Sequence, residues 1–212
     1  MMIKVCGMRD PANIRAVESL GIDMMGFIFY PKSSRYVASR PDYLPASLKK
    51  VGVFVNADEE EILSRVGVFG LDFVQLHGSE STELCDSLRA AGVSVIKVFS
   101  VASSDDLKLC AAYEGHADLF LFDTRCDQYG GSGAIFDWTI LDAYNGGTQF
   151  LLSGGIGPSS VAGLRSFHHP KCCGVDLNSR FEISPANKDV ELLERFIKEY
   201  RNEACTASEK ER

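Results

Sequence analysis

Eight short apolar runs recur along the chain, and their spacing restricts the possible folds more than any other feature. Each run is continuous rather than alternating, which is typical of parallel strands buried on both faces. Their starts lie about 20 to 30 residues apart, which leaves room for a helix and its turns between strands. The runs occupy residues 3–6, 25–29, 51–55, 72–76, 95–99, 119–123, 149–153 and 174–177.

The segments between the runs carry helix signals. Asp10 and Pro11 are typical of a helix start, and Gly21 is typical of its end. The longest amphipathic segment, 188–203, predicts a final helix.

Strand–helix alternation, repeated eight times, predicts an α/β fold of the single-domain (β/α)8 TIM barrel type. The barrel is expected over residues 1–200, followed by a disordered tail over 201–212. The alternative is an open, doubly wound sheet. It is disfavoured because no GxGxxG follows the first run, where Gly7 stands alone.

Composition excludes several classes of protein. The chain has 212 residues and a net charge of −7, which argues against a nucleic-acid partner. No apolar run approaches the roughly 18 residues of a membrane span. Lys4 precedes any apolar leader segment, and the seven cysteines lack zinc-ligand spacing. These features predict a reduced, cytoplasmic protein with no metal site and no membrane association.

In a TIM barrel the chemistry takes place where the strands end, so the ends of the runs hold the candidate catalytic residues. Cys6 ends the first run and could act as a base in its thiolate form. Asp123 ends the sixth run, where partial burial would raise its pKa and suit it to donate a proton. The alternatives are core packing for Cys6 and loop capping for Asp123.

The last two runs end in loops suited to bind an anion. Gly154 and Gly155 allow backbone N–H groups to approach a phosphate closely, and Ser179 follows the eighth run with a hydroxyl. Loops after strands seven and eight form the phosphate site of many TIM barrels. The alternative is that the glycines only make a turn.

Two further residues follow the ends of strands. Arg35, after the second run, could pair with a carboxylate in a bidentate fork, or lie in a solvated loop. His77, after the fourth run, could polarise a substrate, or be a hydrogen-bonded structural group.

Together these ends resemble the phosphoribosylanthranilate isomerase family, from about residue 3 to residue 198. The resemblance is carried, in order, by KVCG, GFIFYPKSSRYV, VGVFVN, DFVQLHG, FLFDT, GGSGAIFDW and LSGGI. It implies a (β/α)8 enzyme of tryptophan biosynthesis that needs no metal or other cofactor. The implied reaction is an Amadori rearrangement of N-(5′-phosphoribosyl)anthranilate to 1-(2-carboxyphenylamino)-1-deoxyribulose 5-phosphate.

The resemblance also implies roles for individual residues. Asp123 would be the general acid and Cys6 the general base, while Arg35 would hold the anthranilate carboxylate. The loop 129–133 would close over the substrate. The remaining substrate-binding residues would be His77, Gly154, Gly155, Asn178 and Ser179, with Asp176 either lining the pocket or serving as an inward structural carboxylate.

The chain departs from the family pattern at two places. Asn178, Ser179 and Arg180 stand where serine–serine–glycine is common, which puts the phosphate contacts there in question. Ala134 stands where lysine is frequent.

Two alternative functions remain open. One is the related isomerase of histidine synthesis. It is disfavoured because those enzymes use two aspartates as acid and base, whereas this chain has Cys6 at the end of the first run. The other is a catalytically silent barrel that binds a phosphorylated ligand. The expected partner is a small phosphorylated substrate, and the expected assembly is a monomer or homodimer.

Overall fold

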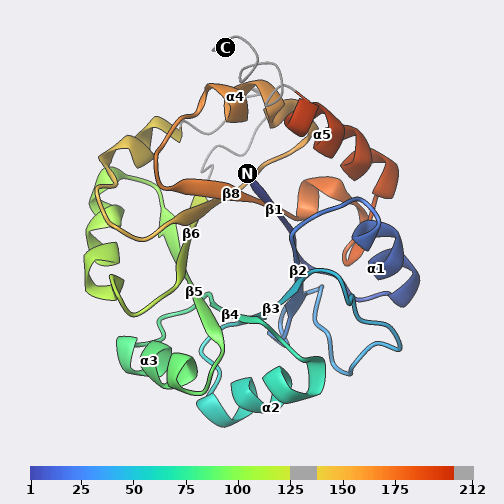
Figure 1. The fold of residues 1–212 in the computed structure, drawn as a ribbon, viewed down its shortest axis with the longest axis horizontal. Coiled ribbons are helices and arrows are strands. Elements are labelled where there is room, and N and C mark those ends of the chain that lie inside the picture. The colour runs from blue at the N-terminus through green and yellow to red at the C-terminus, as the bar shows by residue number, and fades with distance from the viewer. Residues whose placement is uncertain (125–137, 203–212) are drawn as a thin grey trace.

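A closed barrel of eight parallel strands forms the centre of the molecule (Figure 1). The computed structural model describes residues 1–124 and 138–202. All eight strands predicted from the apolar runs are present, and each pairs with its neighbours in chain order. They are β1 (Met2–Val5), β2 (Met24–Ile28), β3 (Lys49–Phe54), β4 (Phe73–Leu76), β5 (Ser94–Val101), β6 (Leu119–Thr124), β7 (Phe150–Ser153) and β8 (Cys172–Leu177).

Helices surround the barrel, and their ends follow from local sequence. The Asp10 carboxylate caps the first helix by accepting a hydrogen bond from Asn13 N at 2.8 Å. Gly70 ends the second in the left-handed conformation, with φ +60°. The α-helices are α1 (Pro11–Glu18), α2 (Glu59–Phe69), α3 (Thr82–Ala90), α4 (Val161–Ser166) and α5 (Val190–Asn202).

Some connections are not α-helical. The segment between the fifth and sixth strands takes the tighter 3-10 form as η1 (Ser104–Tyr113). Other 3-10 turns are η2 (Trp138–Ala143), η3 (Pro158–Ser160) and η4 (Ser179–Phe181), and a short hairpin, β9 (Glu182–Ser184) with β10 (Asn187–Lys188), follows η4.

The expected eight-fold alternation is wrong after β2, because the described segment 29–48 contains no helix. This segment holds Pro31, Pro41 and Pro45. Each proline removes a backbone donor and disfavours helical geometry at the preceding residue. The segment therefore crosses to β3 as an extended loop.

The barrel interior is filled by side chains that alternate along each strand. Leu119 and Leu121 of β6 belong to the inner cluster, so Asp123 continues the same inward face. Met2 packs against this cluster, which places Lys4 and Cys6 inward on β1. The rest of the inner cluster is Met24, Val51, Ile96, Val98 and Leu151.

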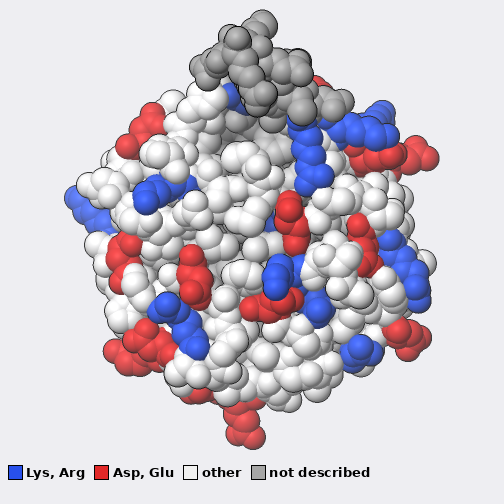
Figure 2. All heavy atoms as spheres, in the orientation of Figure 1, with Lys and Arg blue, Asp and Glu red and all other residues white. Residues whose placement is uncertain are grey.

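The outer core lies between the strands and the helices and is rich in aromatic rings. Phe29 and Phe69 meet edge to face with ring centroids 4.7 Å apart, which is a favourable geometry for aromatic pairs. On the surface shown in Figure 2, lysine and arginine are interspersed with aspartate and glutamate. Of the helices that the structure describes, none is long and apolar enough to cross a membrane.

The domain division stays a prediction. The last helix, α5, runs to Asn202, two residues past the boundary expected at residue 200. Residues 203–212, most of the expected tail, lie outside the described part of the chain.

Candidate active site

Cys6 lies directly after β1, inside the mouth of the barrel, and is 3% exposed. Its backbone N–H donates to Leu177 O at 2.9 Å, which fixes the end of β1 against β8. Gly7 follows with φ +80°, a conformation that favours glycine. On the β2 side, Gly26 leaves room for the thiol, since a Cβ there would lie 2.7 Å from Cys6 Sγ. The strand therefore delivers a thiol into a space that Gly26 keeps open.

Three charged side chains act on the Cys6 thiol. Burial, the largest effect, raises the pKa of Cys6, and the Asp176 carboxylate adds to the rise. The ammonium groups of Lys4 and Lys188 oppose this rise, and Lys4 has the larger effect of the two. The neighbouring cations therefore offset part of the cost that burial adds to forming the thiolate.

Lys4 and Asp176 form an ion pair inside the barrel. Lys4 Nζ lies 2.7 Å from Asp176 Oδ1, with the side chains 0% and 7% exposed. The Ser153 hydroxyl donates to the other oxygen, Oδ2, at 3.3 Å. Burial opposes the charge of Lys4, but Asp176 and then Cys6 raise its pKa above the ordinary value. For Asp176, this arrangement favours the inward structural alternative over direct lining of the pocket.

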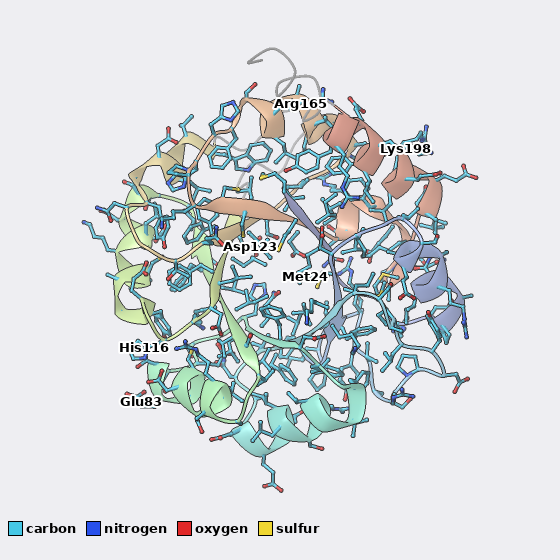
Figure 3. All side chains as sticks on the ribbon, in the orientation of Figure 1. Met24, Glu83, His116, Asp123, Arg165 and Lys198 are labelled. Carbon is cyan, nitrogen blue, oxygen red and sulfur yellow. The ribbon has the colours of Figure 1, made fainter. Side chains whose placement is uncertain are left out.

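Asp123 and His77 lie together on another part of the mouth. Asp123 ends the inward face of β6 and lies within the ring of strands (Figure 3). His77 Nε2 is 3.6 Å from Asp123 Oδ2, and about a third of each side chain is exposed, 35% and 31%. His77 N donates to Phe54 O at 2.9 Å, which holds the loop after β4 in place. The carboxyl and the imidazole are thus accessible from the mouth and can exchange protons with a bound molecule.

Arg35 is held by a carboxylate of this chain. Arg35 Nε and Nη2 donate to Glu182 at 2.9 and 2.6 Å, in a bidentate pair. Lys188 Nζ donates to the same carboxylate at 2.6 Å. Burial alone would raise the pKa of Glu182, but the hydrogen bonds from Arg35 and Lys188 hold it below its usual range. The expected solvated-loop alternative for Arg35 is therefore wrong.

The glycine loops after β7 and β8 come close together. Gly154 and Gly155 have φ +95° and +64°, so both adopt the left-handed conformation that favours glycine. In the following turn, a Cβ at Gly157 would lie 3.3 Å from Arg180 Cβ, so the stem of Arg180 covers this turn. The expected phosphate loops are thus neighbours in space.

The three residues after β8 point in different directions. Asn178 Oδ1 accepts a hydrogen bond from Lys188 Nζ at 2.8 Å, which turns this side chain toward the interior. Ser179 and Arg180 are exposed. Of this triplet, Ser179 and Arg180 therefore have the side chains free to meet an anion from solvent.

Sequence reasoning missed Lys4, Glu182 and Lys188. A charged residue within the apolar run at 3–6, two positions before Cys6, was a signal that the period of a strand could have revealed. No comparable signal marks Glu182 and Lys188, since the hairpin that carries them is not apolar. The expected closing loop 129–133 and Ala134 lie outside the described residues.

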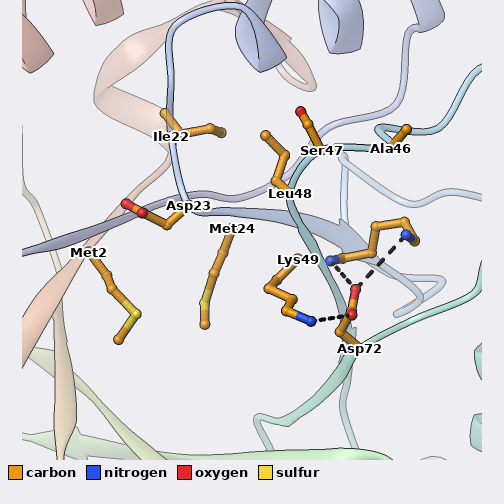
Figure 4. Close-up of a pocket in the computed structure, with 10 residues that line it drawn as sticks. Met2, Ile22, Asp23, Met24, Ala46, Ser47, Leu48, Lys49 and Asp72 are labelled. Carbon is orange, nitrogen blue, oxygen red and sulfur yellow. Dashed lines mark hydrogen bonds and ion pairs between the residues drawn. The ribbon is translucent and has the colours of Figure 1, made fainter.

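A separate cavity of about 470 Å³ opens at the other end of the barrel (Figure 4). It is lined by the first residues of three strands, Met2, Met24 and Lys49. In this cavity Lys49 Nζ forms an ion pair with Asp72 Oδ1 at 2.9 Å. That end of a TIM barrel usually contributes to stability rather than to catalysis. Within the described residues, no cluster of three or more histidine, cysteine or acidic side chains could hold a metal ion.

Comparisons with known proteins agree with the geometry. The family model described as N-(5′-phosphoribosyl)anthranilate (PRA) isomerase matches residues 3–199. An N-(5′-phosphoribosyl)anthranilate isomerase of Phocaeicola vulgatus is 54% identical over 95% of this chain and 98% of the relative. That of Parabacteroides distasonis is 51% identical over 94% of this chain and 93% of the relative.

Solved structures give the same result. Phosphoribosyl anthranilate isomerase from Thermotoga maritima superposes with a TM-score of 0.80 at 32% identity, over 95% of this chain and 99% of that one. A phosphoribosyl anthranilate isomerase in complex with reduced 1-(o-carboxyphenylamino)-1-deoxyribulose 5-phosphate gives 0.78 at 31% identity, with the same coverage. The chain belongs to the N-(5′-phosphoribosyl)anthranilate isomerase family.

Proposed function

We propose that this chain converts N-(5′-phosphoribosyl)anthranilate to 1-(2-carboxyphenylamino)-1-deoxyribulose 5-phosphate, a step of tryptophan biosynthesis. The observation that carries the proposal is that the mouth of the barrel holds both a buried thiol, at the end of β1, and an accessible carboxyl, at the end of β6. An Amadori rearrangement needs one acid and one base. Both groups lie in the mouth of a barrel whose family is that of the isomerase.

Asp123 is proposed as the general acid. It gives a proton to the ring oxygen of the ribose, and the bond between that oxygen and C1′ breaks. The lone pair of the anthranilate nitrogen then forms a double bond to C1′, which gives an open-chain iminium ion. His77, 3.6 Å from Asp123, lies where it can hold the carboxyl and contact the substrate.

Cys6 is proposed as the general base. Its thiolate takes the proton from C2′, and the electrons of that bond form a double bond between C1′ and C2′ while the nitrogen becomes neutral. The enolamine then becomes the ketone, with a proton added at C1′ and one lost from the C2′ hydroxyl. The reaction is balanced within the substrate, because C1′ is reduced as C2′ is oxidised.

Two groups of residues are proposed to bind the two ends of the substrate. Arg35 would hold the anthranilate carboxylate with the part of its guanidinium that Glu182 does not occupy. The backbone N–H groups of Gly154 and Gly155, with Ser179, would hold the phosphate, because glycines in the left-handed conformation can aim N–H groups at an anion. Asn178 would contribute through its backbone, since Lys188 engages its side chain.

The test follows the loss of anthranilate-type fluorescence as freshly generated phosphoribosylanthranilate is consumed. Wild type is compared with Cys6→Ser and Asp123→Asn. General acid–base groups contribute about 10² to 10⁴ in rate, so each variant should lose at least 100-fold in kcat. A wild type that binds a reduced product analogue without turnover would instead identify a silent barrel. Turnover of the histidine-pathway intermediate by Cys6→Ala would favour the related isomerase.

Proposals also follow for the oligomeric state and the cellular location of the protein. One relative from Thermotoga maritima is described as dimeric, and for this chain we propose a monomer or homodimer, which light scattering would distinguish. Location in the cytoplasm is proposed because Cys6, Cys85, Cys110, Cys172 and Cys173 are free thiols, as is usual in reducing compartments.

A further inference from the structure

The Lys4–Asp176 pair has no part in the proton transfers of the proposed reaction, yet it lies against the proposed base. Lys4 lies on β1, and Cys6 follows directly after the strand with its N–H still hydrogen-bonded to Leu177 O, so the two side chains leave the chain on the same face. Lys4 Nζ is 2.7 Å from Asp176 Oδ1, and Lys4 is fully buried. A buried ion pair is costly compared with apolar packing, so a barrel interior gains little stability from it.

We propose that Lys4 is a positioning residue that stabilises the thiolate form of Cys6 against the burial that disfavours it, and that Asp176 orients Lys4 for this task. The inference rests on the proposed role of Cys6 as the general base. It follows the logic of a catalytic triad, in which a third group orients the partner of the reactive one. Here the order is carboxylate, ammonium, thiolate.

The other cations around Cys6 are less suited than Lys4 to stabilise its thiolate. Lys188 faces Cys6 from the hairpin after β8, and Arg35 acts on it from the loop after β2. Both cations share one carboxylate, Glu182, at 2.6 Å from each. On the β2 side, Gly26 contributes no charge. Of the described cations, Lys4 shares the inward face of Cys6 and opposes the rise of the Cys6 pKa most strongly.

The proton balance is simple. The Cys6 thiol loses its proton to solvent before the chemical step, and the Lys4 ammonium stabilises the resulting negative charge. The thiolate then takes the C2′ proton and becomes a thiol again. Lys4 keeps all three of its own protons throughout, so it acts through Cys6 and not on the substrate.

Replacing Lys4 and replacing Asp176 should shift the titration of Cys6 in opposite directions. Lys4→Met removes the cation and leaves the Asp176 carboxylate facing Cys6, so both changes disfavour the thiolate. Asp176→Asn removes the opposing anion, while the amide oxygen can still accept the hydrogen bond from Lys4 Nζ, so Lys4 stays in place with its charge unbalanced and the thiolate is favoured. A charge within a few ångströms shifts a titration by about 1 to 3 pH units. Cys6 should therefore titrate at higher pH in Lys4→Met and at lower pH in Asp176→Asn.

The experiment measures the far-ultraviolet absorbance of the thiolate against pH. Each spectrum is corrected with the matching protein that also carries Cys6→Ser, so that other cysteines and tyrosines cancel. In the profile of kcat/KM against pH, the limb that reports the ionisation of Cys6 should move in the same direction. In Lys4→Met, kcat/KM near neutral pH should fall at least roughly tenfold, because each unit of pKa is tenfold in thiolate population.

Lys97→Met is the matched control. Lys97 and Glu80 form a second buried pair at 2.7 Å, with side chains 3% and 2% exposed, on the outward face of β5. Losing this cation should lower the thermal midpoint without moving the Cys6 titration. The double variant Lys4→Met with Asp176→Asn should titrate between the two single variants, because both charges are gone.

The outcomes separate this inference from the proposed function. Opposite shifts in the two single variants support it. A Cys6 titration that stays in place, or that moves the same way in both, overturns it even if wild type converts the substrate. If Lys4→Met does not fold, the downward shift in Asp176→Asn alone decides. A wild type without turnover would refute the proposed function, while the thiolate titration would still test the pair.

Discussion

Replacing Gly26 by alanine tests whether the space around the thiol is required. Met24 faces the barrel interior, so Gly26, two residues on, faces the same way. An added Cβ would lie 2.7 Å from Cys6 Sγ and 3.1 Å from Cys6 Cα. The backbone cannot easily retreat, because Gly7 N and Met8 N both donate to Gly26 O at 3.0 Å. The clash must therefore displace the thiol, the strand or both.

The magnitude follows from this geometry. Forcing one extra methyl group into a packed interior costs about 1–3 kcal/mol of stability. Real Cβ atoms essentially never come as close as 2.7 Å to another heavy atom, so the Cys6 thiol or its strand must shift. A misplacement on the order of 1 Å can reduce catalysis about 100-fold. We expect Gly26→Ala to fold, to be less stable, and to lose roughly 10- to 100-fold in kcat.

The assay combines urea unfolding with the fluorescence-based turnover measurement. Gly67→Ala is the control, since Gly67 lies within α2 and a Cβ there meets nothing within 4 Å. Alanine should stabilise that helix by about 0.5–1 kcal/mol and leave kcat unchanged. A Gly26→Ala protein with the kcat of wild type would refute the argument that the thiol needs this space.

Two further predictions concern charged groups. Glu182→Gln leaves Lys188 buried without a charged partner and loosens Arg35, so stability should fall by about 3–5 kcal/mol in urea unfolding and KM should rise. Although burial opposes it, hydrogen bonds from Tyr43 and Ser47 lower the pKa of Glu18 to about 2. A depressed pKa gives stability above the unfolded value near 4.5 that is lost as pH falls toward 2. Acid titration of unfolding should show this loss, roughly 1 kcal/mol because solvent screens the half-buried carboxylate, and Glu18→Gln should abolish it.

The barrel could be predicted from the sequence because its strands are buried on both faces. Such strands are continuously apolar, and the eight runs match β1 to β8 within a few residues at each end. The helices were predictable where capping residues mark them, as Asp10 does for α1. The regular spacing of the runs predicts a helix over 29–48, but the three prolines of that segment disfavour one, and the structure has none there.

The candidate site was predictable only in part. Cys6 and Asp123 stand out because each ends an apolar run with a reactive or charged side chain. Their neighbours do not stand out, because the contacts join distant parts of the chain. Lys4 and Asp176 are 172 residues apart in sequence, and Arg35 and Glu182 are 147 apart. Only closure of the barrel, which pairs β1 with β8, brings such residues together.

Apolar side chains and buried charged groups occupy different parts of the barrel. The inner layers formed by Met24, Val51 and Leu119 are apolar and supply cohesion. Besides the Lys97–Glu80 pair on the outward face of β5, buried charges lie around Cys6, in the Lys4–Asp176 pair and at the carboxylate of Glu182. Since apolar residues of similar volume would stabilise such positions at least as well, stability does not account for the charges there. They lie where a thiol, a carboxyl and an anionic substrate require an electrostatic environment that the apolar layers below cannot provide.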